Sequence, residues 1–272
     1  DERHLMKNYR PITLLTSLFK LWEKILDTRA RRILRPHLPP QQTGSQANNS
    51  AALTTVAKKI LVYEHIRNKK PIFSAQIDMN KAYNRVKRAH LWHKLLKLGV
   101  KGKLLAAIMS TYQDSQEIIR IGKTTSKTFH LKNGLRQGSI LSPLLYIIDN
   151  ISLLEALNKH NKGITVSDTN LRIAAFMFVD DLITLAPDPE SMIEQIQITL
   201  DQGWINGAIV STEKSSICTT DPTTDANNEF SHDELLRKHN IPIKTKTSYI
   251  HLGSRHALVP RPHELTATQT AK

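Results

Sequence analysis

Two adjacent acids interrupt a strongly β-prone stretch of this chain. The stretch runs from Phe176 to Leu185, and Asp180 and Asp181 stand in its middle with apolar and β-branched residues on each side. This pattern predicts a β-hairpin whose turn carries both carboxylates at its tip. Two carboxylates fixed on one turn can bind a divalent metal ion. Aspartate is also common in turns for local hydrogen-bonding reasons, so this stretch alone leaves both interpretations open.

The charge and the cysteine content of the chain limit the kinds of partner and site that it can have. The chain has 272 residues, with 38 lysines and arginines against 24 aspartates and glutamates, which gives a net charge of +14. This excess favours a polyanionic partner such as nucleic acid, although a protein that is merely soluble and basic would show it too. The single cysteine, Cys218, excludes an internal disulfide and a cysteine-based zinc site. No apolar run is long enough to cross a membrane. A start without methionine and a polar end indicate a piece cut from a longer polypeptide.

The order of elements predicts an α+β fold. Helical apolar spacing is found over residues 14–26, where we expect the apolar face to pack inward, and the helix continues as a basic segment over residues 29–35. A second helical pattern covers residues 51–67. After residue 71 the pattern alternates between strands and helices, which favours a sheet covered by helices on one face. The expected strands lie at 72–78, 117–121, 128–131, the 171–186 hairpin and around 217; the expected later helices lie before Gly99 and at 104–112, 142–157 and 190–200.

Asp78 ends the strand over residues 72–78. A carboxylate there needs an ion partner, a hydrogen bond or a metal ion, and capping of the following helix is an equally simple explanation. If its strand lies beside the hairpin, Asp78 becomes a third carboxylate next to Asp180 and Asp181. Mg²⁺ prefers hard oxygen ligands, so three convergent acids predict a magnesium site. Two such ions roughly 4 Å apart can activate a hydroxyl and stabilise a leaving oxygen in phosphoryl transfer.

The segment over residues 133–145 combines two glycines with polar side chains before a helix. The glycines let the backbone approach a ligand, while Arg136 and Gln137 offer donors at a helix entrance whose dipole favours anions. We expect Ser142 to be the N-cap of that helix and Pro143 to occupy its first position.

Two of these strings together resemble a known family. Residues 134–143 and 178–181, in this order after a strand that ends in Asp78, resemble reverse transcriptases, specifically those of the non-LTR (LINE-type) retrotransposon branch. The resemblance extends over residues 8–254. It implies a right-hand polymerase with a ferredoxin-like palm sheet. Residues 1–70 would form mostly helical, basic fingers, 71–255 the palm with inserted fingers elements, and 256–272 a tail, with the thumb absent.

The resemblance also implies roles for the residues that match the family's motifs. Two Mg²⁺ ions would be held by the carboxylates of Asp78, Asp180 and Asp181 and by the carbonyl of Met79. Lys214 would be a further catalytic residue, as the proton donor to departing pyrophosphate. The implied nucleotide-binding residues are Tyr83, as a steric gate against a ribose 2′-OH, with Arg136, Gln137 and Gly138; the implied primer-binding residues are Tyr249, Leu252 and Gly253.

Three positions depart from the family's pattern. Asn84 stands where a second aspartate is usual, but that residue is not a metal ligand. Val179 replaces the commoner alanine, a change that a small apolar turn position should tolerate. The segment 44–50 carries no positive charge, whereas the corresponding family segment supplies an arginine that contacts the nucleotide. Triphosphate binding is the property that this last departure weakens.

The primary hypothesis is therefore an RNA-directed DNA polymerase whose partners are an RNA template, a DNA primer or target, and dNTPs. No membrane is expected, and the site of action is cytoplasmic, nuclear or both. The alternative is an inactive or truncated retroelement remnant that binds RNA or DNA without polymerising. A nucleotide cyclase with a similar palm is disfavoured by the charge of +14. Basic pairs such as Lys87-Arg88 are either solvated surface or contacts to template phosphates.

Overall fold

The structure is a computed structural model that describes residues 9, 11–166, 169–220, 236, 239, 241, 243–245, 248–251 and 254–257. Its residues fall into two compact units. The first comprises residues 1–38, 81–151 and 206–208, and the second comprises residues 39–80, 152–205 and 209–272. The division of the chain at residue 70 into fingers and palm stays a prediction.

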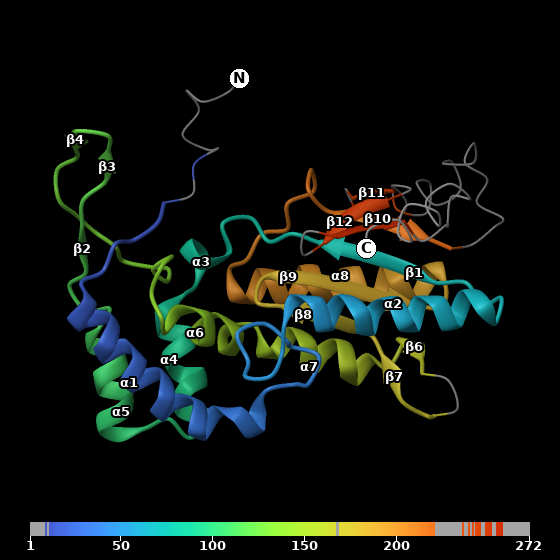
Figure 1. The fold of residues 1–272 in the computed structure, drawn as a ribbon, viewed down its shortest axis with the longest axis horizontal. Coiled ribbons are helices and arrows are strands. Elements are labelled where there is room, and N and C mark those ends of the chain that lie inside the picture. Colours follow the sequence, from blue (N-terminus) through green and yellow to red (C-terminus); the bar gives the residue numbers. More distant parts are fainter. Residues whose placement is uncertain are drawn as a thin grey trace, which may run out of the picture. The chain divides into compact units, whose positions relative to one another are not determined.

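A five-stranded sheet forms the centre of the second unit (Figure 1). Its order is β11-β10-β1-β9-β8, so β1 lies in the middle and β8 at one edge. Pairing is antiparallel except between β10 and β11. The strands are β1 (Phe73–Ile77), β8 (Ala175–Phe178), β9 (Asp181–Ala186), β10 (Ser216–Thr219) and β11 (Lys244–Thr245). The predicted strand before Asp78, the hairpin and the strand around residue 217 are confirmed.

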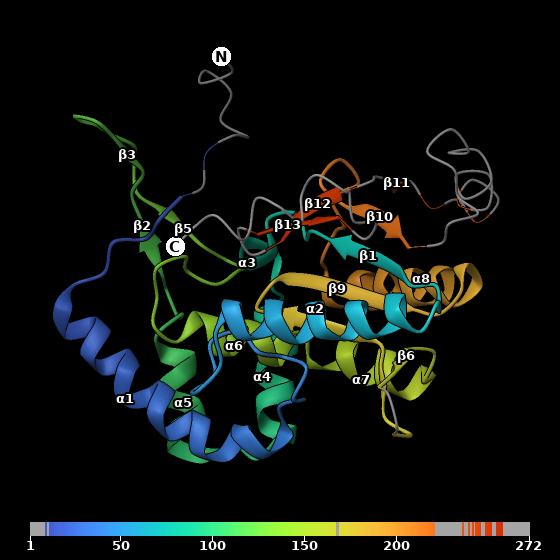
Figure 2. The same ribbon diagram turned by 45° about the vertical axis from the view of Figure 1, so that its right-hand side comes forward.

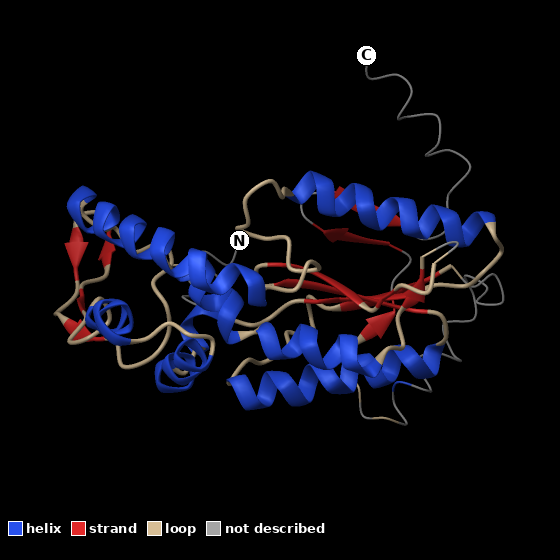
Figure 3. Ribbon diagram, turned by 90° about the horizontal axis from the view of Figure 1, so that it is seen from below, coloured by secondary structure: helices blue, strands red, loops and turns tan. Residues whose placement is uncertain are grey.

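Helices cover both faces of this sheet. Figure 3 shows α2 (Ala51–Arg67) on one side and α7 (Ile151–His160) with α8 (Pro189–Asn206) on the other. On the α2 side, Leu61 belongs to a buried apolar cluster with sheet residues that include Ile183 and Cys218. On the α8 side, the hydroxyl of Thr184 lies 3.4 Å from the sulfur of Met192. Neighbouring residues of β9 thus point to opposite faces, as the period of a strand requires. The predicted α+β fold is confirmed, but the expectation that helices cover only one face of the sheet is wrong, because both faces are apolar and α2 packs on the second.

The helices α1 and α2 turn polar residues inward. In α1 (Ser17–Leu34) the buried residues include Glu23 and Asp27, whereas Leu18 and Leu21 are exposed. The expectation that the apolar face of residues 14–26 packs inward is therefore wrong for most of that face, although Leu26 is buried. The reason is that the inward side of α1 carries Glu23, whose buried carboxylate accepts hydrogen bonds from Ser139 Oγ and from the amide of Ile140. In α2 the buried residues are likewise mostly polar: Thr54, Thr55, Lys58, Leu61 and His65.

The first unit is mainly helical. It contains α1, the 3-10 turn η2 (Arg35–His37), α3 (Ala82–Arg85), α4 (Arg88–Lys97), α5 (Gly102–Ser110) and α6 (Ser142–Asp149). Four short strands form two antiparallel pairs: β2 (Gln116–Glu117) with β5 (Phe129–His130), and β3 (Arg120–Ile121) with β4 (Thr124–Thr125). In Figure 2, β3 continues beyond β2 and β5, away from α4 and α5, as an extended arm.

The helix predicted over residues 142–157 is two helices, because α6 ends at Asp149 and α7 begins at Ile151. Its predicted cap is also wrong. Ser142 lies inside α6, Leu141 occupies the N-cap position without a side-chain bond, and Ser139 Oγ accepts from the amides of Leu141 and Ser142, both at 3.2 Å. The cap comes from Ser139 because this hydroxyl, three residues earlier, reaches the unpaired amides of the first turn.

Two further antiparallel pairs complete the described elements: β6 (Ile164–Thr165) with β7 (Arg172–Ile173), and β12 (Ser248–His251) with β13 (Ser254–Ala257). Within the described part of the chain, no helix combines the length and the apolar character needed to span a bilayer.

Candidate active site

The two adjacent acids lie at a tight hairpin turn. Phe178 on β8 pairs with Asp181 on β9, so only Val179 and Asp180 form the connection. Val179 has a φ of 60°, the left-handed region that β-branched residues rarely adopt. The turn thus places Asp180 at the tip and Asp181 at the first position of β9, both half-buried.

Asp78 faces this turn from the neighbouring strand. The register of β1 and β9 pairs Ile77 with Leu182, and continuing it by one residue places Asp78 opposite Asp181. Residues that face each other across antiparallel strands have Cα atoms about 4.5–5.5 Å apart and point to the same face of the sheet. This continuation of the register places Asp78 and Asp181 at the ends of adjacent strands, with Asp180 one residue away on the turn.

The backbone of Asp78 is held by the segment that precedes β10. The amide of Asp78 donates to Ser215 Oγ at 3.1 Å, and its carbonyl accepts from the amide of Ser211 at 2.8 Å. Lys214 lies in the turn between these two serines, and its side chain is exposed. The sequence predicted Lys214 as a catalytic residue, and the structure places its turn beside the end of β1.

Met79 pairs with Val210 in an isolated antiparallel bridge. The bonds that flank this bridge use the carbonyl of Asp78 and the amide of Asn80, which donates to Ile209 O at 2.7 Å. This pairing therefore does not use the carbonyl of Met79. The carbonyl is buried with its residue and stands one position beyond Asp78.

The oxygen donors around Asp78 fit Mg²⁺ by type. Across the described residues, no group of three or more His, Cys, Asp and Glu side chains is gathered in a metal-holding arrangement. Mg²⁺ does not need such a cage, because it is commonly held by one or two carboxylates together with substrate phosphates and water. Asp78, Asp181 and the neighbouring Asp180 are the carboxylates that would supply those ligands, and the carbonyl of Met79 would add a further hard oxygen. Their roles as metal ligands stay predictions.

Tyr83 lies in the first unit, on the one-turn helix α3. Its ring stacks on that of Tyr146, with centroids 5.0 Å apart and planes 10° from parallel. Its carbonyl accepts from the amide of Leu135 at 2.8 Å. A Cβ on Gly134 would lie 2.8 Å from the carbonyl oxygen of Asn84. Tyr83 and Asn84 are thereby packed against the loop that leads to α6.

Arg136 is engaged by protein groups inside the first unit. It is 9% exposed, its Nη2 atom donates to Ser115 Oγ, and its Nε atom lies 3.6 Å from a carboxylate oxygen of Glu117. The guanidinium also lies over the rings of Tyr112 and Phe19, at 4.9 and 5.5 Å from their centroids. Its Nη1 atom is buried without a hydrogen-bond partner among the described residues.

Gln137 and Gly138 contact the segment before α1. The carbonyl of Gln137 accepts from the amide of Thr13 at 2.6 Å, while its side chain is half-buried. Gly138 has a φ of 110°, and a Cβ there would lie 2.7 Å from the carbonyl oxygen of Thr13. The glycine is needed both for the backbone conformation and for this close approach. The nucleotide-binding roles predicted for Tyr83, Arg136, Gln137 and Gly138 stay predictions.

Arg88 is a structural residue that the sequence did not reveal. It is 9% exposed and donates to four main-chain carbonyls: Gly134 at 2.8 Å, Leu131 at 2.8 Å, Tyr112 at 3.1 Å and Asn133 at 3.4 Å. Burial lowers the pKa of Arg88 below its usual value. The idea that Arg88 is solvated surface or contacts template phosphates is wrong, because its donors are used inside the unit.

Glu23 supports the same loop from α1. Its carboxylate is fully buried, accepts from Ser139 Oγ at 2.6 Å and accepts from the amide of Ile140 at 3.0 Å. Ser139 in turn caps α6. A polar residue within an apolar helical pattern gave no signal of this role in the sequence.

The predicted primer-binding residues fall at the limit of the described chain. Tyr249 lies in β12, and Leu252 and Gly253 lie outside the described residues.

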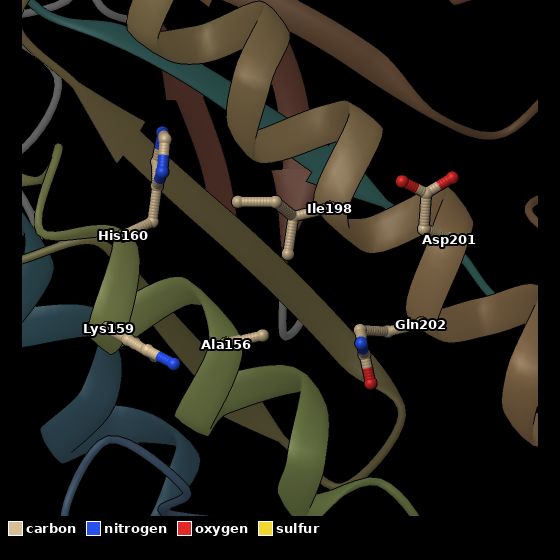
Figure 4. Close-up of a pocket in the computed structure, with 6 residues that line it drawn as sticks. All are labelled: Ala156, Lys159, His160, Ile198, Asp201 and Gln202. Carbon is tan, nitrogen blue, oxygen red and sulfur yellow. The ribbon is translucent and has the colours of Figure 1, made fainter.

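A shallow pocket of about 390 Å³ lies between α7 and α8 (Figure 4). Its lining residues are Ala156, Lys159, His160, Ile198, Asp201 and Gln202. None of the residues predicted for catalysis lines it. His160 and Lys162 both contact Glu194, at 2.8 and 3.1 Å, and these hydrogen bonds lower the pKa of that carboxyl.

The fold has known counterparts among polymerases. The telomerase of Candida albicans, solved with a TWJ fragment of telomeric RNA, is similar with a TM-score of 0.58 at 14% identity, over 88% of this chain and 37% of that one. A telomerase of Candida tropicalis, also solved with a TWJ fragment, has a TM-score of 0.52 at 15% identity, over 76% and 34%. The chain thus has the fingers-and-palm fold of polymerases, as predicted.

A family model described as "Reverse transcriptase (RNA-dependent DNA polymerase)" matches residues 2–254. The chain belongs to this reverse transcriptase family. The predicted resemblance to the non-LTR retrotransposon branch is confirmed by relatives of this chain from that branch.

One relative is a "Probable RNA-directed DNA polymerase from transposon BS" of Drosophila melanogaster, 34% identical over 151 residues, which cover 52% of this chain and 16% of the relative. Another is a "Retrovirus-related Pol polyprotein from type-1 retrotransposable element R2" of Popillia japonica, 25% identical over 181 residues, which cover 65% and 25%. The matched part of the chain spans a quarter or less of the length of these relatives.

Proposed function

We propose that this chain carries the catalytic core of an RNA-directed DNA polymerase of a non-LTR retroelement, which adds dNTPs to a primer 3′-OH on an RNA template with two Mg²⁺ ions. The observation that carries the proposal is the strand register. The last observed pair is Ile77 with Leu182, so continuing the register by one residue sets Asp78 opposite Asp181, beside the turn that bears Asp180. This arrangement of carboxylates occurs in a chain of the reverse transcriptase family.

The carboxylates of Asp78, Asp180 and Asp181 and the carbonyl of Met79 would hold the metal ions. Bound Mg²⁺ supplies activation of the primer hydroxyl and charge neutralisation at the phosphates. The protein contributes orientation, because Asp78 is fixed by two backbone hydrogen bonds and both neighbouring acids by a tight turn. Lys214, exposed on the adjoining turn, would give its proton to the departing pyrophosphate oxygen.

Tyr83 would select deoxyribonucleotides. Its position five residues after Asp78 matches the family's gate position. One face of its ring is stacked on Tyr146, and this contact limits the rotation of the side chain. A ring held in this way would keep its place against a ribose 2′-OH. Arg136, Gln137 and Gly138 would border the nucleotide through the loop before α6.

The positive charge would bind template and primer. A net charge of +14 suits contacts to many phosphates, and such binding weakens as salt concentration rises. Tyr249, Leu252 and Gly253 would contact the primer end.

The test is primer extension on an RNA template with dNTPs and Mg²⁺. We expect extension that follows the template sequence, and we expect Asp180→Asn to lower its rate by at least about a thousandfold, because electrostatic stabilisation of this kind contributes several kcal/mol to catalysis. Asp201→Asn, which changes an exposed aspartate of α8 bonded to Gln197, is the matched control and should extend like the wild type.

Extension by Asp180→Asn at the wild-type rate would refute the assignment of the site. Salt-sensitive RNA binding by the wild type without any extension would instead identify the inactive remnant and refute the proposed activity.

A further inference from the structure

A short segment outside the predicted site contacts the catalytic turn. Residues 41–43 run parallel to β8, the edge strand of the sheet, with Gln42 bridged to Met177. The amide of Met177 donates to the carbonyl of Gln41 at 3.0 Å, and the amide of Thr43 donates to the carbonyl of Met177 at 2.9 Å. The hydroxyls of Thr43 and Thr54 lie 2.6 Å apart and tie the segment to α2. This segment therefore covers the edge of β8 directly before the turn.

Gln42 reaches from this segment to the turn itself. Its side chain is buried, with 1% exposure of the residue. Its Oε1 atom accepts from the amides of Val179 and Gly44, both at 3.0 Å, and its Nε2 atom donates to the carbonyl of Val179 at 3.4 Å. Gln42 thereby engages both polar main-chain groups of the residue that precedes Asp180.

Val179 needs such support. A β-branched residue at a φ of 60° is strained, and a strained residue persists only where its surroundings hold it. The hydrogen bonds from the Gln42 side chain to the amide and carbonyl of Val179 can hold this residue in its strained conformation. The two peptide groups involved are those on each side of Val179, so they also set the direction in which Asp180 leaves the turn.

Gly44 packs directly on the turn. A Cβ at this position would lie 2.4 Å from the amide nitrogen of Val179, 2.6 Å from its Cγ2 atom and 2.9 Å from the carbonyl carbon of Phe178. Two of these are backbone atoms, so a larger residue would displace the turn itself. A glycine here is required by the close approach.

We propose that Gln42 is a positioning residue for nucleotidyl transfer, which fixes the turn of Val179 and Asp180 so that the acids keep their place opposite Asp78. Its effect on catalysis rests on the proposed function, whereas its effect on the turn rests on the contacts above. The segment 44–50 lacks the arginine that is usual in this family. Gln42, two residues before it, would serve the proposed site in a different way, by holding the turn that carries Asp180.

The experiment compares Gln42→Met with Gln41→Met. Methionine keeps the volume of glutamine and removes its amide. Gln41 is the matched control because its side chain pairs with Asn158 instead, at 3.2 and 3.4 Å, and its main-chain bond to Met177 does not depend on the side chain. Two properties are measured: hydrogen exchange of the Val179 and Asp180 amides, and kcat for primer extension with RNA affinity determined separately.

We expect Gln42→Met to raise exchange of the turn amides about tenfold or more while amides of β1 stay protected. We expect kcat to fall by about 10- to 100-fold, because a misplacement of about 1 Å has this effect on catalysis. RNA affinity should stay within about twofold, and Gln41→Met should match the wild type. Gly44→Ala should likewise raise exchange of the turn amides and lower kcat. If Gln42→Met does not fold, the result for Gly44→Ala is used in its place.

Unchanged exchange of the turn amides in a folded Gln42→Met protein would overturn the proposal, as would equal effects of the two methionine variants. The exchange measurement stands even if the wild type does not extend primers, in which case the proposed polymerase activity fails and the role of Gln42 in the turn is judged by exchange alone.

Discussion

Replacing Arg88 by methionine should lower the free energy of unfolding by about 3 kcal/mol. Arg88 donates to the carbonyls of Gly134, Leu131 and Tyr112 at 2.8, 2.8 and 3.1 Å, and to that of Asn133 at 3.4 Å. A hydrogen bond to a charged group contributes about 1.5–3 kcal/mol, so the three short bonds together contribute about 4.5 kcal/mol or more. Burying the guanidinium, which lowers the pKa of Arg88, offsets part of this sum.

The assay is denaturant unfolding followed by circular dichroism. Lys97→Met removes an exposed cation from the same helix, α4, and should change the free energy by less than about 0.5 kcal/mol. Arg88→Lys should recover less than half of the loss, because one ammonium group cannot match the fork of a guanidinium. An Arg88→Met protein within about 1 kcal/mol of the wild type would show that the loop before α6 does not depend on these bonds.

Two other predictions concern residues of the first unit, the buried Asp149 and the half-buried Tyr83. Burial raises the pKa of Asp149 from 3.8 to about 6, with Lys94 opposing the shift. The folded state then binds this proton more tightly than the unfolded state. The resulting stabilisation of the fold is present below pH 4 and is lost as pH rises to about 6; it is at most about 3 kcal/mol. Unfolding free energies measured from pH 4 to 7 should show this fall in the wild type and a weaker one in Asp149→Asn; identical profiles would contradict it. Tyr83→Ala should raise incorporation of ribonucleotides relative to deoxyribonucleotides by about tenfold or more in competitive primer extension, because it removes the bulk proposed to exclude a 2′-OH. An unchanged ratio would remove Tyr83 from that role.

Local patterns predicted the centre of the fold. The hairpin around Asp180 and the strand before Asp78 were recognisable because β-prone residues flank the acids and the chain must turn between them. The register that pairs the two strands follows once both bury an apolar face.

Polar contacts over long sequence distances were not predictable. Gln42 binds a turn 137 residues away, Arg88 binds a loop 46 residues away, and Glu23 binds an amide 117 residues away. None of these belongs to a periodic pattern. A glycine two residues after Gln42 was the one local sign of a close approach, and it pointed to no partner.

The prediction of which faces of α1 and α2 pack inward was wrong for a related reason. Apolar spacing assumes that the apolar side packs inward, but Glu23 in α1 and Thr54 in α2 take inward positions through hydrogen bonds. Leu18 of α1 and Val56 of α2 are exposed as a result. A pattern of hydrophobicity cannot show where a polar side chain finds a buried partner.

The most direct measurement of the central claim is a change of metal preference at Asp78. A thiolate is a softer ligand than a carboxylate and suits Mn²⁺ better than Mg²⁺. If Asp78 holds the metal, Asp78→Cys should extend a primer on an RNA template with Mn²⁺ but not with Mg²⁺, and Asp78→Ala should extend with neither. Full extension by Asp78→Cys with Mg²⁺ would contradict the account, because a residue that tolerates this exchange does not ligate the catalytic ion.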